Sequence, residues 1–278
     1  MPEINSANLE QLHPSIQSAV RAIPVSDRYF IALSGGLDSM ALLAFALPYL
    51  LKFYKPTIQI IHVHHGLSEH ADAWAEVCLT VCAQLNVVCH VERVQVLEQG
   101  KGLEAAARDA RYAVFERYLE KGGVLLQGHH LNDQAETILM KLLKGAGPEG
   151  LSGIPQQRSL AGGCVFRPWL TLARSTLELE VKNAAIKWIE DDSNTDIRFD
   201  RNYLRHEVLP VLERRWKGSV NEIARSGAKA KDAYQFQLSW CRSVIGDVMS
   251  SVYLHESVLS IEALSDFEDV KQVLLVRY

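Results

Sequence analysis

The feature that most restricts the fold of this chain is a regular alternation of short β-rich runs with longer helical stretches. The predicted strands, at residues 29–34, 57–63, 87–94 and 124–128 with a weaker fifth at 165–166, are rich in Val and Ile. They do not alternate strictly with polar residues, which is typical of strands covered on both faces. Helical stretches are predicted between them, at residues 38–50, 69–85, 103–120 and 131–143.

Parallel strands need crossovers of this kind, so the sequence predicts an α/β fold with a doubly wound parallel sheet over residues 1–215. Ligands of such sheets bind beyond the carboxyl ends of the strands. After residue 215 the strand signal ceases and residues 219–246 read as one long helix, so we expect a helical second domain over 216–278. The chain ends on an apolar run, which favours a truncated protein, although a C-terminal core helix is the alternative.

The charge of the chain is unevenly distributed. The 278 residues include 29 Lys and Arg against 33 Asp and Glu, yet residues 198–231 alone carry nine basic and four acidic residues. Such a basic island suits contact with a polyanion such as nucleic acid, and a solvated helix face is the alternative. The five cysteines suggest no disulfide framework, and the longest apolar run, 41–51, is too short to span a bilayer. We therefore expect a cytoplasmic protein without a membrane partner.

The strongest motif is Ser34-Gly35-Gly36-Leu37-Asp38-Ser39, between the first predicted strand and the first predicted helix. Adjacent glycines let backbone amides converge on an anion, and the helix N-terminus adds partial positive charge. The hydroxyls of Ser34 and Ser39 can donate to phosphate oxygens. A carboxylate at Asp38 would repel a phosphate unless Mg²⁺ lies between them. A simple helix cap at Asp38 or Ser39 is the alternative.

Three other patterns are rejected on their context. Residues 145–150, Gly-Ala-Gly-Pro-Glu-Gly, match a dinucleotide fingerprint but follow a helix, not a strand. His62 and His64 face one side of a strand and His65 the other, with no Cys or carboxylate in register, which does not suit zinc. A calcium loop beginning at Asp192 would need Gly and Glu where Ile197 and Tyr203 stand.

Seven further stretches accompany the glycine motif in a fixed order: 62–68, 104–112, 128–137, 144–151, 167–170, 191–194 and 201–205. With Ser-Gly-Gly-x-Asp-Ser they closely resemble the tRNA(Ile)-lysidine synthetase family of the PP-loop, or N-type ATP pyrophosphatase, superfamily. The resemblance covers roughly residues 28–215. It implies a Rossmann-like PP-loop domain, and that family carries a further C-terminal domain that has no counterpart in these 278 residues.

The resemblance also implies a reaction. The family uses ATP and Mg²⁺ to adenylate the C2 oxygen of the wobble cytidine in tRNA(Ile) with a CAU anticodon. Free L-lysine then displaces AMP to give lysidine, and a homodimer is possible. Related enzymes that thiolate tRNA use Cys-x-x-Cys pairs, whereas Cys78 and Cys82 are four apart on a helix and suit core packing.

The candidate site residues follow from the motif and the resemblance together. For ATP they are Ser34, Gly35, Gly36, Leu37, Asp38, Ser39, His62 and His64; for catalysis Asp38, Asp133 and Arg111; for the metal Asp38 and Asp133; and for tRNA Arg108, Arg198, Arg201, Asn202 and Arg205.

Several of these assignments have alternatives. Asp133 with Glu136 also forms a capping-box-like pair, and Asn132 stands where the family commonly has a second aspartate. His129 and His130 either reach the nucleotide or pack. Arg198, Arg201 and Arg205 lie on one helix face within the basic island. The lysine-binding carboxylate is open among Glu104, Asp191 and Asp192.

Two other functions compete with the tRNA ligase. One is a PP-loop adenylating enzyme that acts on another tRNA base or on a small molecule. The basic stripe of Arg198, Arg201 and Arg205 disfavours the small molecule. The other is a nucleotide-binding module whose chemistry has been lost.

Overall fold

A computed structural model describes residues 9–97, 100, 102–253 and 256–278 of the chain. These form two compact units, one made of the residues up to 136 together with 154–220, the other of 137–153 together with 221–278. Within the described residues, no helix is long and apolar enough to cross a membrane.

The first unit is built on a six-stranded sheet with the order β3-β2-β1-β4-β6-β5. All neighbouring strands are parallel except β5 and β6, which form an antiparallel pair at one edge. The strands are β1 Arg28–Ala32, β2 Thr57–His64, β3 Val88–Arg93, β4 Val124–Leu126, β5 Gln157–Leu160 and β6 Gly163–Phe166. The doubly wound α/β prediction is confirmed, and β5 is a strand that the sequence pattern did not predict.

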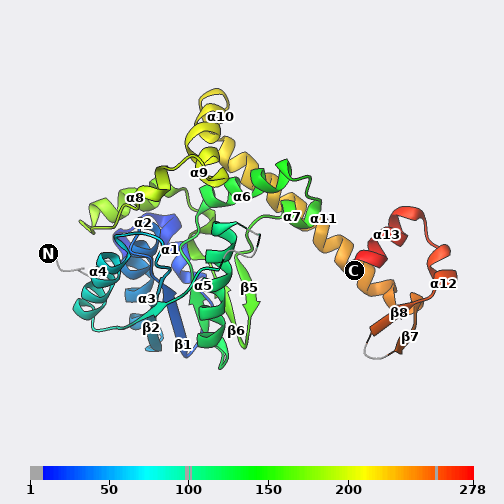
Figure 1. Ribbon diagram of the computed structural model, residues 1–278, viewed down its shortest axis with the longest axis horizontal. Coiled ribbons are helices and arrows are strands. Elements are labelled where there is room, and N and C mark those ends of the chain that lie inside the picture. The colour runs from blue at the N-terminus through cyan, green and yellow to red at the C-terminus, as the bar shows by residue number, and fades with distance from the viewer. Residues whose placement is uncertain (1–8, 98–99, 101, 254–255) are drawn as a thin grey trace. The chain divides into compact units, whose positions relative to one another are not determined.

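Helices cover both faces of this sheet (Figure 1). The helices of the first unit are α1 Pro14–Arg21, α2 Leu37–Ala41, α3 Leu47–Phe53, α4 Ala71–Gln84, α5 Leu103–Leu119, α6 Leu131–Leu143, α8 Arg174–Asn183, α9 Asp200–Tyr203 and α10 Leu209–Arg215, with α6 passing into the second unit after Glu136. Short 3₁₀ turns lie at Leu9–Gln11, Pro168–Thr171 and Asp192–Thr195.

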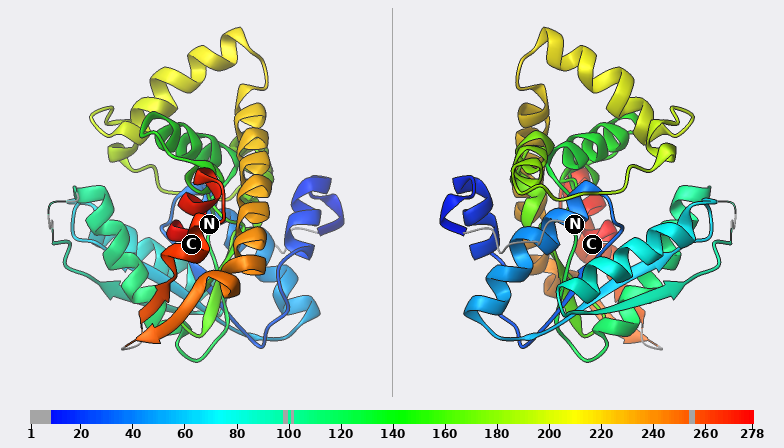
Figure 2. Two further views of the ribbon diagram at one scale, coloured as in Figure 1. Left: turned by 90° about the vertical axis from the view of Figure 1, so that its right-hand side faces the viewer. Right: turned by 90° about the vertical axis from the view of Figure 1, so that its left-hand side faces the viewer.

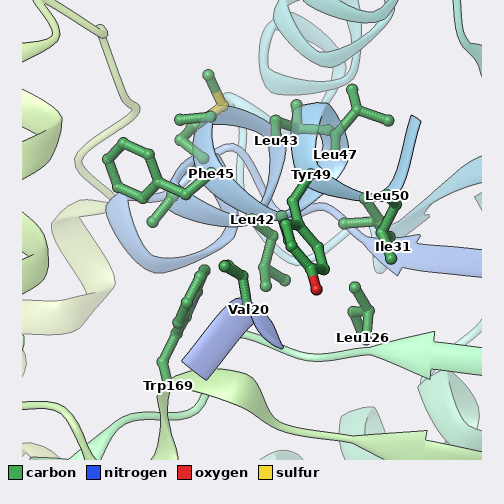
Figure 3. Close-up of a cluster of buried hydrophobic side chains, with 14 of the residues drawn as sticks. Val20, Ile31, Leu42, Leu43, Phe45, Leu47, Tyr49, Leu50, Leu126 and Trp169 are labelled. Carbon is green, nitrogen blue, oxygen red and sulfur yellow. The ribbon is translucent and has the colours of Figure 1, made fainter. Parts of the chain in front are cut away.

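Alternation along the strands divides the core into two layers. Tyr29 and Ile31 of β1 face a large cluster with α1, α2, α3 and α8, whereas Phe30 between them faces the opposite side, against α5. Figure 3 shows part of the first layer, where Trp169 and Phe45 lie among leucines of the helical run after β1. Burial on both faces explains why the central strands β1 and β4 are mainly apolar.

Two π-helical segments, Leu42–Ala46 and Leu204–Val208, interrupt otherwise continuous helical runs. Each directly precedes a helix with proline at its second position, Pro48 in α3 and Pro210 in α10. Proline lacks the N–H for the bond to the fourth preceding carbonyl and crowds that carbonyl, so widening the preceding turn relieves the clash.

The second unit is mainly helical. It contains α7 Pro148–Leu151, most of α11 Ser219–Val248, α12 Ile261–Ser265 and α13 Asp269–Arg277. Figure 2 shows α11 leading into a two-stranded hairpin, β7 Met249–Tyr253 with β8 Glu256–Leu259. A small core around Cys241, Val248 and Leu275 joins α11 to α13. The long helix matches the sequence prediction, but the hairpin corrects the expectation that strands cease after residue 215.

Candidate functional site

The carboxyl ends of β1, β2 and β4 open onto one cavity of about 700 Å³ in the first unit. Its lining includes many of the predicted residues: Ser34, Gly36, Asp38, Ser39, His62, His64, Arg111, Asp133, Arg201, Asn202 and Arg205. Gly35, Leu37, Arg108 and Arg198, which were also predicted, are not among the lining residues. The cavity therefore lies where the α/β topology places ligands.

The loop between β1 and α2 is held in shape by its own serines. The Ser39 hydroxyl accepts hydrogen bonds from the N–H groups of Ser34 and Gly35, both at 3.2 Å, and donates one to the Gly36 carbonyl at 2.9 Å. Ser34 Oγ accepts from the Gly36 N–H at 3.3 Å. Ser39 thus closes the loop rather than presenting a free hydroxyl to a ligand.

Two glycines allow other segments to approach this loop. Gly35 has φ +87°, and a Cβ there would lie 2.5 Å from Cδ1 of Ile189. A Cβ on Gly128, just after β4, would lie 2.7 Å from the carbonyl oxygen of Asp38. Because that atom belongs to the backbone, only glycine permits the loops after β1 and β4 to pack this closely.

The carboxylate of Asp38 has a hydrogen-bond partner missing at one of its two oxygens. Its Oδ1 is buried and has no hydrogen-bond partner within the described chain, and its Oδ2 lies 3.6 Å from Nε2 of His130. Burial raises the pKa of Asp38; the charge of Asp133 adds to this effect, and His130 opposes it. A buried carboxylate oxygen without a donor is costly in isolation and suits a bound cation.

In the loop after β4, by contrast, polar groups of His130 and Asp133 hydrogen-bond to each other. The His130 N–H donates to Oδ2 of Asp133 at 2.9 Å, and the Asp133 N–H donates to Nδ1 of His130 at 3.3 Å. This is a reciprocal capping box at the start of α6, with His130 as the N-cap. The predicted capping role of Asp133 is therefore present, but its partner is His130 and not Glu136.

Asp133 and the fully buried Glu136 are also bound by two arginines of the predicted basic stripe. Arg201 donates to Asp133 at 2.9 Å and to Glu136 at 2.8 Å. Arg205 donates to Asp133 at 3.2 Å and to both oxygens of Glu136 at 2.7 and 2.9 Å. Burial alone would raise the pKa of Asp133, but His130 and Arg201 outweigh it and hold this pKa at about 2.

The remaining members of the stripe are arranged differently. Arg198 is 87% exposed in its side chain and pairs with Asp196 at 2.7 Å, and the Asn202 amide donates to the Asp196 carbonyl at 3.0 Å.

Arg111 lines the cavity, and within the part of the chain that the structure describes it forms no ion pair or hydrogen bond. Arg108 stacks on the Tyr112 ring, 4.9 Å from its centroid.

The predicted histidines mostly support the end of β2. His62 is buried, and its Nδ1 donates to the Leu33 carbonyl at 2.9 Å; burial lowers its pKa. His64 Nε2 lies 3.1 Å from Asp72 and 3.3 Å from Arg93. Burial and the charge of Arg111 lower the pKa of His65 to about 4. The contacts of His62 and His64 thus connect the end of β2 to Leu33, Asp72 and Arg93.

Within the described residues, no group of three or more His, Cys, Asp or Glu side chains is placed to hold a metal ion. Mg²⁺ commonly takes only one or two carboxylates and completes its shell with phosphate oxygens and water. The orphan oxygen of Asp38 fits such a role, whereas both oxygens of Asp133 already accept hydrogen bonds.

Sequence reasoning did not assign roles to Gln127 and Arg167, which form the wall behind His129. Arg167 is 1% exposed and hydrogen-bonds to Gln127 and His129. The available signal was a charged residue between buried Phe166 and Pro168 in an otherwise apolar segment.

Of the carboxylates considered for lysine, Glu104 and Asp191 line the cavity, while the side chain of Asp192 lies outside the described residues.

Comparison with known proteins shows which family the chain belongs to. The model of the PP-loop domain matches residues 7–212. The chain therefore belongs to the PP-loop family.

Curated relatives named tRNA(Ile)-lysidine synthase are similar over the same region. The Pseudomonas fluorescens protein is 47% identical over 203 residues, covering 73% of this chain and 46% of that protein. The Vibrio parahaemolyticus protein is 37% identical and the Shigella flexneri protein 38% identical, covering 89% and 92% of this chain. The chain spans about half the length of these relatives.

Among solved structures, a U34-tRNA thiolase from Methanococcus maripaludis, described with its 4Fe–4S cluster, superposes with a TM-score of 0.62. It is 16% identical, and the match covers 77% of this chain and 76% of the thiolase. This likeness concerns the fold. Cys78 and Cys82 are buried, and burial raises the pKa of Cys78 to about 12, as expected for packed thiols.

Proposed function

We propose that this chain binds ATP at the loop after β1 and adenylates the wobble cytidine of tRNA(Ile), as the first step of lysidine formation. The observation that carries the proposal is that the glycine-rich loop and Asp38, whose Oδ1 has no hydrogen-bond partner within the described residues, line the same cavity. The curated relatives named for this activity support the choice of substrate.

The chemistry proceeds in two displacements. The C2 oxygen of cytidine attacks the α-phosphorus of ATP, the bond to the β-phosphate breaks, and pyrophosphate leaves. The ε-amine of lysine then attacks C2, the C2–O bond breaks, AMP leaves, and the surplus proton of the amine passes to solvent. Each step needs fixed positioning and compensation of phosphate charge more than covalent help from the protein.

Different residues would contact the pyrophosphate, the metal ion and the tRNA. Backbone N–H groups of the glycine loop and the start of α2 would hold the departing pyrophosphate. Mg²⁺ held by Asp38 would neutralise charge on the phosphates. The unpaired Arg111 would face the same phosphates, while exposed Arg108 and Arg198 would contact the tRNA backbone. Arg201, Asn202 and Arg205 line the cavity near Asp133, where the reacting nucleotide would enter.

AMP release from ATP labelled on the α-phosphate tests the proposal. We expect AMP only when tRNA(Ile) is present, and lysidine only when lysine is added. Asp38→Ala should lower AMP release by at least about 100-fold, the usual scale for losing one charge-stabilising contact, with an unchanged circular dichroism spectrum. Asp27→Ala, an exposed change at the amino end of β1, is the matched control.

AMP formation that requires neither tRNA nor lysine would contradict the proposal and favour a small-molecule adenylating enzyme. Unchanged AMP release in Asp38→Ala would remove Asp38 from the mechanism.

A further inference from the structure

His129 lines the cavity, and one of its ring nitrogens, Nδ1, is hydrogen-bonded to Arg167. It follows β4, lines the cavity, and is half-buried. Its Nδ1 accepts a hydrogen bond from Nε of Arg167 at 3.3 Å. Arg167 itself is not among the lining residues, so its contact leaves Nε2 as the ring nitrogen on the cavity side.

The chemistry of the donor determines the state of the imidazole. A guanidinium has N–H groups and no acceptor, so the nitrogen that it contacts must carry a lone pair. The proton of the neutral ring must then sit on Nε2. A protonated imidazole would instead point an N–H at the N–H of Arg167.

Arg167 is held for this contact at an energetic cost. It is 1% exposed, and its hydrogen-bond partners are all neutral: Pro155 O at 2.7 Å, Gln127 at 2.9 Å, Tyr112 at 3.1 Å and His129. Burying a cation without a carboxylate is unfavourable, and simple packing would be served by an apolar side chain.

We propose that Arg167 is a positioning residue that fixes His129 as the Nε2–H tautomer, so that a neutral hydrogen-bond donor faces the cavity. The identity of its acceptor, a phosphate oxygen of the bound nucleotide, rests on the proposed function.

The charges around His129 act in the same direction. Burial lowers its pKa most, Arg167, Arg201 and Arg111 lower it further, and Asp133 opposes them; the pKa is about 3. The ring therefore stays neutral through the physiological range and offers a donor of constant charge.

Histidine NMR tests the tautomer directly. In protein labelled with ¹⁵N-histidine, two-bond ¹H–¹⁵N correlations identify the protonated ring nitrogen, and His129→Gln assigns the signal. We expect protonated Nε2 and free Nδ1 for His129, unchanged between pH 5.5 and 8.5. A protonated Nδ1 in the wild-type protein would overturn the proposal without any variant of Arg167.

Substitutions of Arg167 separate positioning from packing. In Arg167→Met we expect mixed tautomers, because no N–H group then requires a lone pair on Nδ1, whereas Arg167→Lys, which retains a donor, should preserve the wild-type tautomer. A tautomer unchanged in a folded Arg167→Met protein would contradict the proposal. Thermal unfolding checks that each variant is folded.

Affinity for Mg²⁺·ATP supplies the functional readout. Arg167→Met and His129→Gln should each weaken the Kd at pH 7.5 by about tenfold, the worth of one good hydrogen bond, and the double variant by no more than either alone. Additive losses would indicate a purely structural Arg167. If the wild-type chain does not bind ATP, the proposed function fails while the tautomer result stands by itself.

Discussion

The loops after β1 and β4 meet at the same cavity and each starts a helix, yet they treat their carboxylates in opposite ways. Asp38 keeps one buried oxygen without a partner, and burial raises its pKa. Asp133 has both oxygens occupied, by His130 on one side and by two arginines on the other. We infer that the loop after β1 binds the ligand through Asp38. The loop after β4, whose carboxylate is already hydrogen-bonded, is a rigid part of the cavity lining.

The largest effect should come from removing the buried charge of Glu136, which binds Arg201 and Arg205. Glu136→Gln leaves Arg201 and Arg205 without the fully buried charge that balances them, and removing one partner of a buried ion pair costs about 3–5 kcal/mol. We expect the free energy of unfolding in urea to fall by that amount. Glu178→Gln, which breaks an exposed pair with Lys182, should cost under about 0.5 kcal/mol. Equal effects of the two changes would show that the buried cluster is not what holds α9 to α6.

Acid should remove the stabilising contribution of the Asp133 carboxylate. Its pKa in the folded protein is about 2, below the value of an unfolded aspartate, so it stabilises the fold above about pH 4 and loses this effect as the pH falls towards 2. Asp133→Asn should lose about 2 kcal/mol of stability at pH 7, a deficit that shrinks as the pH falls. Urea unfolding at a series of pH values measures it. A deficit independent of pH would mean that the side-chain charge is not responsible.

Asp38 should give a smaller effect of opposite sign. Because its folded pKa is raised, the charged form is disfavoured, and stability falls as the pH rises above the pKa of the unfolded residue. Asp38→Asn should therefore raise the free energy of unfolding at pH 7 by about 1 kcal/mol, the lower end for an unsatisfied buried group. The wild type should be stabilised further by Mg²⁺·ATP, and the variant much less so. A destabilised Asp38→Asn protein would argue that Asp38 is structural.

The smallest effect should be on tRNA binding by Arg108 and Arg198, which do not contact Asp133 or Glu136. Arg108 stacks on Tyr112 and forms no ion pair within the described residues, whereas Arg198 is already paired with Asp196. If Arg108 contacts a tRNA phosphate, Arg108→Ala should reduce the slope of log K against log salt by about one, because one fewer counterion is released. Arg198→Ala should change the slope less. Filter binding of tRNA(Ile) between 50 and 200 mM salt measures both, and the reverse order would contradict this reading.

Much of this architecture was predictable from the sequence because the central strands are buried on both faces. Continuous Val- and Ile-rich runs identified β1, β2, β3 and β4, and α6 begins and ends at its predicted residues. The edge strand β5, Gln157–Leu160, was missed because its polar sequence lacks any apolar run. The hairpin of β7 and β8 was missed for a similar reason, since its polar residues gave no strand signal after the long helix.

The site was less predictable than the fold because its chemistry depends on contacts between distant segments. The glycine motif located the cavity, but the spacing of Arg201 and Arg205 indicated an exposed stripe. Their carboxylate partners lie more than sixty residues earlier, which no local pattern reveals. Arg167 and Gln127 were missed for the same reason. The domain boundary at 215 and the assignment of individual residues to ATP, metal and tRNA remain predictions.

The most direct test of ATP binding at the loop after β1 is a crystal structure of the protein with a non-hydrolysable ATP analogue and Mn²⁺, located by its anomalous signal. We expect the β- and γ-phosphates against the loop from Ser34 to Ser39 and Mn²⁺ bound to Oδ1 of Asp38. A triphosphate bound elsewhere, or a cation that avoids Asp38, would contradict the account.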